Sequence, residues 1–532
     1  MKRTVFGILA VAMALALVFS GCASGGSAPA GSSDIPAEER QADIVIVGGG
    51  ASGMAAALAA LEQGGGKVIV IEQQDHIGGT SLLGSEGFFA IESAQQKAAG
   101  ITTTVADMMD WFTNYTHHLS NAGLTYNWLS QSAGTVDWLA QYGMPSTLME
   151  NTQYAHRNQI ATYHKYNNKQ TGYTAFEENV KKMGGEIILN TKVTDLIQAA
   201  DGTVTGVVAT KPDGGELRVS AKAVILATGG YLANAEMFEE YTGLKPGTYI
   251  SMTSGTTGEG QIMAIKAGAD TYGIHGATYH GAMTFGAPDE LMMTPMLWVD
   301  GGGDRFCNEE LVYDFALWGN IAYSVGGYYW VVVDTTTLQK IVADGSPYTH
   351  SFGKTYAVGT NDLDYSVSPA TANWPAGFAP NPDIIKTMDE LVAANPSVLK
   401  AYSIEELAVA MGIPAANLQA SIDLYNQAVA AQHDVRFGKD PAYLLYDVST
   451  GPFYALKTMV LAEGSLGGIS VNERLEVIRQ DRTVISGLYA TGSNVGMIYG
   501  DSYPSFEGVN MSFAFNSGRM AGYNSATKIL GR

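Results

Sequence analysis

The order of apolar and polar positions predicts a strand, a helix and a second strand near the start of the chain. Residues 43–47 form a largely apolar, β-branched run with the length of a buried strand, and they lead into a glycine-rich turn at 48–53. An alanine-rich stretch that continues to Leu61 favours a helix, and a second strand-like run at 67–71 ends on Glu72. This succession predicts a parallel βαβ unit.

The glycine-rich turn has the G-x-G-x-x-G spacing of a dinucleotide-binding loop. Gly48 would make the tight turn, Gly50 would let the backbone approach a pyrophosphate, and Gly53 would let the helix pack on the strand. The helix N-terminus would then face the phosphate charge, and Glu72 would accept hydrogen bonds from a ribose. A glycine turn without a ligand is the alternative, but the complete unit around it favours a nucleotide.

The first residues predict export with a lipid anchor. Two basic residues precede an apolar run at 5–19, which ends on Ser20-Gly21-Cys22, as in a secretory signal that closes on a lipidated cysteine. Residues 1–22 are therefore expected to be a lipoprotein signal peptide, and the Gly-, Ser-, Ala- and Pro-rich residues 23–41 a flexible linker. An ordinary cleaved signal or an N-terminal membrane anchor is the alternative, although the run is short for a span.

Composition limits the partners and the metals. The 532 residues are 46% hydrophobic and 15% charged, which is enough to bury a large core. A net charge of −21 disfavours nucleic acid, because phosphate binding draws on clustered Lys and Arg. Cys22 and Cys307 are the only cysteines, so the chain cannot build a disulfide framework or a cysteine-ligated zinc or iron–sulfur site, and no metal is expected. Electrons would then arrive from a partner.

Further short motifs follow one another in a fixed order along the chain. One of them, at 77–87, is a second glycine-rich stretch similar to the G-G-x-x-x-L-x-x-x-G segment that runs beside an FAD pyrophosphate and that nicotinamide dehydrogenases lack. The others are the segments 190–193, 223–230, 257–260, 487–492 and 510–521. Together with the βαβ unit, they make 42–270 and 463–532 resemble the FAD-dependent fumarate reductase/succinate dehydrogenase flavoprotein family, which includes flavocytochrome c-like, urocanate reductase-like and ketosteroid dehydrogenase-like enzymes.

The resemblance implies an α/β fold in which a Rossmann-like FAD-binding domain is interrupted by an inserted α+β capping domain. The FAD-binding domain would comprise 42–272 and 463–532, with a mobile cap between them at 273–462. Val193 would face the adenine, and a helix from Asn510 would point its N-terminus at the flavin. The residues expected to bind FAD are Gly48, Gly50, Ala51, Ser52, Gly53, Glu72, Gly78, Gly79, Thr80, Ser81, Gly84, Gly87, Val193, Ala227, Thr228, Gly229, Glu259, Gly492, Ser493, Asn510 and Met511.

The expected cap lacks the residues with which fumarate-type enzymes hold and protonate a dicarboxylate. Its segment 304–309 is similar to the family motif G-x-R-F-x-N-E, but the family's proton-donor arginine falls on Tyr313. A family histidine falls on Gly464, and a clamp arginine falls near Ser505. The cap contains only two arginines in all. Because bidentate arginine is the usual partner of a carboxylate, fumarate is not the expected substrate.

Tyr313 is the first candidate for the proton donor, because a phenol stays protonated at neutral pH and can donate. The alternative is that Tyr313 only packs in the cap and that His280, Glu463, Tyr499 or Tyr503 acts instead. Most aromatic residues of this part of the chain would be core residues, yet an aromatic, arginine-poor lid suits a bulky, less charged acceptor. These aromatic residues are Tyr272, Tyr279, Trp298, Tyr313, Trp318, Tyr323, Tyr328, Tyr329, Trp330, Tyr499 and Tyr503.

The leading hypothesis is a reductase that transfers hydride from flavin N5 to an activated C=C bond of an enone, a lactone or an acrylate-type acceptor, while a cap acid supplies the proton. Its setting would be anaerobic electron-acceptor reduction at the extracytoplasmic face of the membrane, with a membrane or extracytoplasmic flavin or haem protein as electron donor. One alternative is the reverse reaction, as in a ketosteroid dehydrogenase-like enzyme. Another is a lipid-anchored flavoprotein that only relays electrons.

Overall fold

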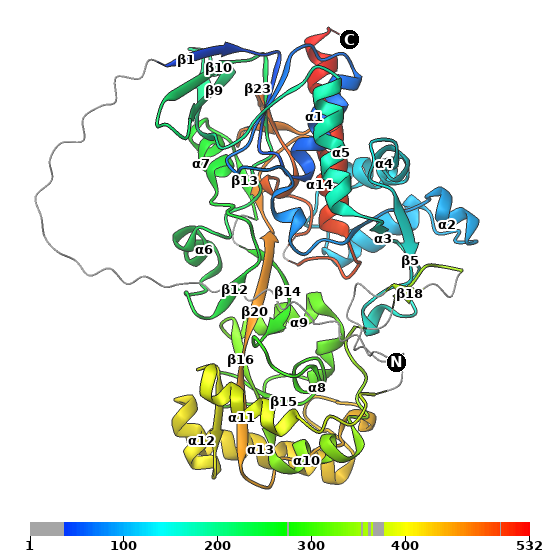
Figure 1. Ribbon diagram of the computed structural model, residues 1–532, viewed down its shortest axis with the longest axis vertical. Coiled ribbons are helices and arrows are strands. Elements are labelled where there is room, and N and C mark those ends of the chain that lie inside the picture. Colours follow the sequence, from blue (N-terminus) through cyan, green and yellow to red (C-terminus); the bar gives the residue numbers. More distant parts are fainter. Residues whose placement is uncertain are drawn as a thin grey trace, which may run out of the picture.

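The computed structural model describes residues 37–531, apart from 274–275, 353–354, 360–362, 365–376 and 501. The predicted signal peptide, Cys22 and most of the predicted linker lie outside the described residues. Figure 1 shows two lobes, one with the C-terminal helix α14 (Val509–Ile529) and one with the helices α10 to α13, and the long strand β20 (Phe453–Ser465) runs from one to the other. Within the described residues, no helix combines the length and the apolar character needed to cross a membrane.

A six-stranded sheet forms the centre of the lobe that contains α14, in the order β22-β23-β11-β2-β3-β7. All neighbouring strands in it are parallel except β22 and β23. Three of them, β2, β3 and β11, are buried throughout, as expected for a parallel sheet covered on both faces. The strands are β2 (Ile44–Val47), β3 (Val68–Ile71), β7 (Glu186–Ile188), β11 (Ala223–Leu226), β22 (Glu476–Ile478) and β23 (Val484–Ala490). The predicted parallel βαβ unit is therefore confirmed.

Helix α1 (Ala51–Glu62) follows β2, as the alanine-rich pattern predicts, and packs directly against α14. Gly518 and Gly522 of α14 lie so close to the backbone of Ser52 and Ala56 that a Cβ atom at either position would overlap it. Glycine at both positions therefore lets the two helices approach closely. The N-termini of both helices open on the cavity described below.

A four-stranded sheet in the order β1-β10-β9-β8 lies beside this core. Its strands β8 (Lys192–Gln198) and β9 (Val204–Thr210) form a hairpin, which β10 (Glu216–Ser220) extends. Strand β1 (Glu38–Gln41) pairs in parallel with the edge of β10. The prediction of a flexible linker over 23–41 is thus wrong for its last residues. Pairing along the edge of β10 satisfies the backbone of these four polar residues, and no local pattern in the sequence reveals it.

The same lobe contains a three-stranded sheet, in the order β4-β6-β5. Buried aromatic rings such as Phe89, Phe112, Trp128 and Phe506 pack edge to face between these elements. The elements are β4 (Gly87–Phe89), β5 (Ser146–Met149), β6 (Tyr163–Tyr166), α2 (Ala94–Ala98), α3 (Val105–Tyr115), α4 (Ala122–Gln141) and α5 (Lys169–Lys182). This aromatic core supports the loop that leads into β6 and the N-terminus of α14.

The second lobe is built on a sheet in the order β12-β20-β16-β15, and β14 and β19 also pair with β20. Its strands are β12 (Tyr249–Ser251), β14 (Ala277–Met283), β15 (Leu297–Val299), β16 (Tyr328–Asp334) and β19 (Val398–Ala401). Its helices are α8 (Asp289–Met292), α9 (Phe315–Ser324), α10 (Thr335–Asp344), α11 (Ile384–Ala394), α12 (Ile404–Met411) and α13 (Ala415–Ala431). The short pairs β13 (Thr271–Tyr272) with β21 (Gly468–Ile469) and β17 (Thr355–Tyr356) with β18 (Leu363–Asp364) lie outside these sheets. The predicted α/β fold with an inserted α+β cap is confirmed.

Side-chain packing does not break at the predicted domain boundaries. Strand β20 runs through the junction predicted at 462–463. Tyr231, Leu244 and the buried face of helix α6 (Ala235–Thr242) pack in the core of the second lobe, although they precede residue 273. The boundaries themselves stay a prediction.

Candidate active site

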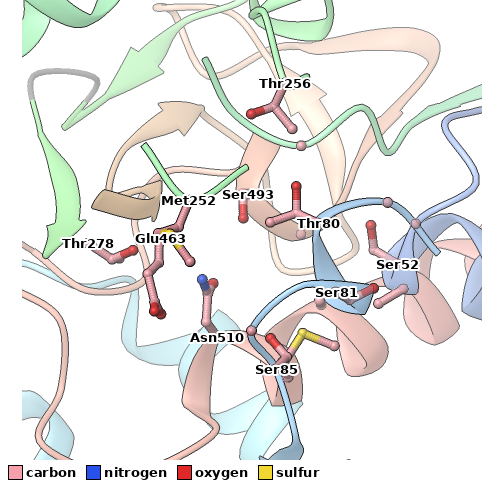
Figure 2. Close-up of a pocket in the computed structure, with 18 of the residues that line it drawn as sticks. Ser52, Thr80, Ser81, Ser85, Met252, Thr256, Thr278, Glu463, Ser493 and Asn510 are labelled. Atoms are coloured by element: carbon pink, nitrogen blue, oxygen red, sulfur yellow. The ribbon is translucent and has the colours of Figure 1, made fainter. Parts of the chain in front are cut away.

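A large cavity lies at the carboxyl ends of β2, β3 and β11, the edge at which open α/β sheets bind ligands. Its volume of about 420 Å³ lies within the ~300–1,000 Å³ of ligand sites. We call its two sides, both visible in Figure 2, the glycine-loop end and the cap end. The glycine-loop end carries Ser52, Thr80 and Ser81, and the cap end carries Thr278, Glu463 and Asn510.

The glycine-loop end is formed by backbone rather than by side chains. Gly48 has a φ of +106°, and a Cβ atom there would overlap the carbonyl group of Ala227. A Cβ atom at Gly53 would overlap the carbonyl group of Gly48. At Gly50 it would instead meet no overlap, since the nearest atom is Gly78 O at an ordinary contact distance of 3.9 Å. Two of the three motif glycines therefore fix the turn, and the third leaves room for a ligand against the backbone.

The N-terminus of α1 faces this room. Gly50 is its N-cap and provides no side chain to bind the first amides. Glu72 lies beside it, and its Oε2 accepts from Gly49 N at 2.6 Å while its Oε1 accepts from Gln74 N at 2.8 Å. These bonds hold the carboxylate at the wall, where its remaining lone pairs can accept from hydroxyl groups. A free helix N-terminus next to a fixed carboxylate suits a pyrophosphate followed by a ribose.

Almost all residues that the sequence predicts as FAD contacts line this cavity. Val193 does so at the start of β8, where the neighbouring Lys192 forms an ion pair of 2.5 Å with Glu259 of helix α7 (Glu259–Lys266). Gly53 is the one exception among the predicted contacts, because it packs against Gly48. That the predicted residues contact the cofactor directly stays a prediction.

At the cap end, the N-terminus of α14 opens on the cavity. Gly508 is its N-cap, with a φ of +76° and no side-chain cap. Asn510 N donates to the Tyr503 hydroxyl at 3.0 Å, which leaves the proton of that hydroxyl available to a molecule in the cavity. Burial raises the pKa of Tyr503, as do the nearby charges of Glu463 and Glu507, so the phenol is protonated at neutral pH.

Tyr503 shares the wall with two more of the predicted catalytic candidates, His280 and Glu463. His280 Nδ1 lies 3.5 Å from Glu463 Oε1, and both side chains are partly exposed. The His280 ring packs edge-on against Phe315, with 4.8 Å between the ring centroids. Because the pair reaches solvent, it can carry protons between solvent and the cap end.

Tyr313 does not line the cavity, which corrects the prediction that its hydroxyl faces a substrate. Its side chain is 4% exposed, and its hydroxyl donates to Thr349 O at 3.2 Å in the core of the second lobe. Two further tyrosine rings pack against it, and this burial raises the pKa of the phenol. An aromatic ring is stabilised among such neighbours. The family's arginine at the same position would instead extend towards the ligand. Tyr499 is also buried behind the wall, with its hydroxyl 3.4 Å from Asn510 Oδ1.

The cap motif at 304–309 holds the second lobe together. Arg305 is buried, and its guanidinium donates to both carboxylate oxygens of Glu309 at 2.8 Å and to Asp434 at 2.7 Å. Lys439 pairs with Glu309 at 3.2 Å. The Arg305 charge is thus balanced inside the lobe, and Arg305 does not line the cavity.

The cap end carries negatively charged side chains at the place where fumarate-type enzymes have the arginine and histidine side chains that hold a dicarboxylate. A Cβ atom at Gly464 would lie 2.9 Å from Asn510 Nδ2 and 3.0 Å from Thr278 Oγ1, so a larger side chain there would have to displace these two side chains. Ser505 lines the wall, and no arginine is found among the described residues that surround the cavity. The charged residues of the wall are Glu72, Glu86, Lys192, Glu259, Glu463 and Glu507. A dicarboxylate would therefore meet carboxylates at the cap end.

Sequence reasoning missed a second polar group at the cap end. His156 is buried and lines the cavity, and its Nε2 lies 3.1 Å from Asp314 Oδ2. Glu507 accepts from the backbone amides of Thr152 and Gln153 at 2.8 and 3.0 Å. His156 and Asp314 are 158 positions apart, so no spacing in the sequence connects them. The only hint was that Asp314 directly follows Tyr313, the position of the family's donor arginine.

The family model described as FAD binding domain matches residues 43–505. The chain belongs to this FAD binding domain family. It is an FAD-dependent oxidoreductase, and the glycine-rich loops, Glu72 and the two free helix N-termini are the parts that fit FAD.

Named relatives of this FAD-dependent oxidoreductase include reductases of several substrates. Vinyl phenol reductase of Lactiplantibacillus plantarum is 33% identical over 469 residues, which are 85% of this chain and 90% of that protein. NADH:fumarate oxidoreductase of Klebsiella pneumoniae is 26% identical over 86% of this chain, but the match spans 44% of that longer protein. The crystal structure of 3-ketosteroid delta1-dehydrogenase from Sterolibacterium denitrificans superposes with a TM-score of 0.69 at 18% identity, over 92% of this chain and 100% of that one. This last likeness shows the fold alone.

Proposed function

We propose that this oxidoreductase reduces an activated C=C bond in a substrate that carries little negative charge. The observation that carries the proposal is the Tyr503 hydroxyl, which Asn510 N orients at a cap end without an arginine among the described wall residues. A neutral proton donor suits an alkene conjugated to a carbonyl group or an aromatic ring, whereas a dicarboxylate needs cationic partners. The identity of 33% with a vinyl phenol reductase supports the reducing direction.

The chain's own residues account for the binding and proton-transfer steps. The uncapped N-terminus of α14 offers positive dipole charge to the electron-rich edge of a flavin. FAD, when bound and reduced, supplies a hydride to one alkene carbon. Tyr503 protonates the other alkene carbon, and its raised pKa keeps the proton in place until then. The His280–Glu463 pair returns a proton to Tyr503 from solvent.

An anaerobic screen tests this proposal. The FAD-loaded protein is reduced with a viologen and mixed with 4-vinylphenol, an enone, an unsaturated lactone, an acrylate ester or fumarate, while reoxidation of the flavin is followed by absorbance. We expect at least one neutral alkene to reoxidise it more than about tenfold faster than fumarate. Fumarate turnover equal to that of the best alkene would contradict the proposal. Failure of every alkene would favour electron relay, and faster oxidation of the saturated product with a dye would favour a dehydrogenase.

We also propose that the protein is exported and anchored at the extracytoplasmic face of the membrane through Cys22, and that a membrane or extracytoplasmic flavin or haem protein reduces it in an anaerobic pathway. The support is the signal pattern at 1–22 and the absence of cysteines for an iron–sulfur centre in the chain. Cys22→Ser should move the protein from the membrane to the soluble fraction. An unchanged membrane fraction and an unchanged mass would contradict the lipid anchor.

A further inference from the structure

We infer that His156, held by Asp314, accepts a hydrogen bond from the hydroxyl of a phenolic alkene at the cap end. The inference rests on the proposed function and narrows its substrate to an alkene conjugated with a para-hydroxyphenyl ring. The His156 side chain lines the cavity and is 2% exposed, and its Nδ1 atom has no hydrogen-bond partner in the described part of the chain. A buried polar atom of this kind is costly unless a ligand completes it.

Asp314 decides which nitrogen of His156 carries the hydrogen. Asp314 Oδ1 accepts from Leu317 N at 3.1 Å as the N-cap of α9, and Asp314 Oδ2 lies 3.1 Å from His156 Nε2. Burial alone would raise the pKa of Asp314, but the hydrogen bonds from His156, Leu317 N and Ser505 hold it below its ordinary value. An ionised carboxylate only accepts, so His156 Nε2 donates. In the neutral imidazole, Nδ1 is then an acceptor.

The surroundings of Nδ1 favour a ligand that donates. Glu507 Oε1 is 4.0 Å from Nδ1, beyond a hydrogen bond, and it already accepts from the amides of Thr152 and Gln153. Glu507 is itself an acceptor and gives no proton to Nδ1, so a ligand hydroxyl that donates is the complementary partner. Tyr279 and Phe352, also in the wall, provide apolar surface for an aromatic ring.

A hydroxyl bound in this way activates the alkene. Transfer of the phenol proton to His156, together with transfer of the Tyr503 proton to the outer alkene carbon, converts a para-hydroxystyrene into an isomeric quinone methide with the same hydrogens and electrons. The benzylic carbon is now electrophilic and takes the hydride of the proposed function, and His156 returns its proton to the phenolate oxygen. The sum is one hydride and one proton added across the double bond, and the His280–Glu463 pair restores Tyr503.

The test compares two ligands on the oxidised, FAD-loaded protein, with binding followed by the flavin absorbance. 4-Ethylphenol has the hydroxyl donor, and 4-ethylanisole is its methyl ether without one. We expect the parent protein to bind 4-ethylphenol at least about tenfold more tightly, because the ether leaves Nδ1 without a partner. Binding shifts the flavin absorbance, whereas oxidation of 4-ethylphenol in the reverse reaction would bleach it, so the assay separates binding from the reaction.

Asp314→Asn is the sharpest variant for this test. Asparagine can still cap α9 through its Oδ1, but its amide would donate to His156 Nε2 and so turn Nδ1 into a donor. An ether oxygen can accept from that donor, and the preference for 4-ethylphenol should fall below about threefold. The control is Tyr313→Phe, which removes a buried hydrogen bond from the adjacent residue outside the cavity wall and should leave the preference unchanged.

Equal binding of the two ligands to the parent protein, or no binding of 4-ethylphenol, would overturn the inference. So would an Asp314→Asn protein that keeps the full preference. If that variant does not retain FAD, His156→Leu, which has no acceptor, must lose the preference in the same way. A protein that reduces other alkenes but shows no ligand preference refutes this inference alone, and a protein that shows the preference but reduces no alkene refutes the proposed function alone.

Discussion

The glycine-loop end of the cavity comes mainly from backbone and from residues close together in the sequence, whereas the cap end is assembled from side chains of distant segments. At the first end, the residues 48–53 and the carboxylate of Glu72 shape the wall. At the second, His156, Asp314, Glu463 and Tyr503 come together from both lobes. The pyrophosphate of FAD is always the same, and backbone amides with enough room can bind it. A particular substrate instead needs particular hydrogen-bond donors and acceptors. We therefore expect changes at the first end to abolish cofactor binding and changes at the second to alter chemistry and specificity.

The largest effect is expected from Gly50→Val. Its side chain would occupy the open space that Gly50 leaves against the backbone, so the protein should fold but purify without the yellow cofactor. The ratio of FAD to protein, with circular dichroism as a check on folding, measures this. Gly134→Val, at an exposed site in α4 where the nearest atom to a Cβ is Arg519 Nη1 at 3.8 Å, is the control and should keep its FAD. A Gly50→Val protein with full FAD content would contradict the conclusion that the glycine-loop end binds the cofactor.

The next largest effect is expected from Tyr503→Phe at the cap end. Loss of the oriented hydroxyl should slow reoxidation by the best alkene by about 100- to 10,000-fold, the usual effect of a missing general acid. The FAD content and the rate of reduction by the viologen should stay near those of the parent protein, because the glycine-loop end is untouched. Stopped-flow reoxidation measures the change. A decrease of less than about fivefold would remove Tyr503 from the proton-donor role.

Arg305→Met should change stability rather than chemistry. It would leave the carboxylates of Glu309 and Asp434 buried with only Lys439 nearby, and breaking such a buried network should lower the free energy of unfolding by about 3–5 kcal/mol. Urea unfolding measures this, and Arg436→Met, at an exposed position, is the matched control with little expected change. If folded Arg305→Met protein lost its preference for neutral alkenes over fumarate, Arg305 would belong to the substrate site after all.

The smallest effect is expected from Tyr313→Phe, which sharpens the contrast between the two tyrosines. Its hydroxyl bonds to Thr349 O away from the cavity, so reoxidation by the alkene should stay within about threefold of the parent protein. The same stopped-flow assay as for Tyr503→Phe measures this. A loss of 100-fold or more would restore the donor role that the sequence alone suggested for Tyr313.

Much of the glycine-loop end could be predicted because its function is encoded locally. The spacing of Gly48, Gly50 and Gly53 before an alanine-rich helix, and the acid at the end of the next strand, specify one backbone shape with one kind of ligand. The strand β1 was missed because its four residues are polar and its pairing partner lies far along the chain. Tyr313 was assigned to the wrong place because a matching position in a motif does not say where a different side chain points. In the structure its ring packs against two other tyrosine rings, whereas an arginine at this position would extend towards the ligand.

The sequence by itself determined the cofactor, the α/β architecture and the loss of the dicarboxylate clamp, since these depend on short motifs and on the presence or absence of arginines. Only the tertiary structure decided which polar groups face the ligand. It brought His156 to Asp314 across 158 positions, placed the Tyr503 hydroxyl against the Asn510 amide in the first turn of α14, and enclosed Arg305 in a buried ion-pair network. The physical reason is that backbone shape follows from neighbouring residues, whereas the direction and the partners of a side chain follow from whatever the whole chain packs around it.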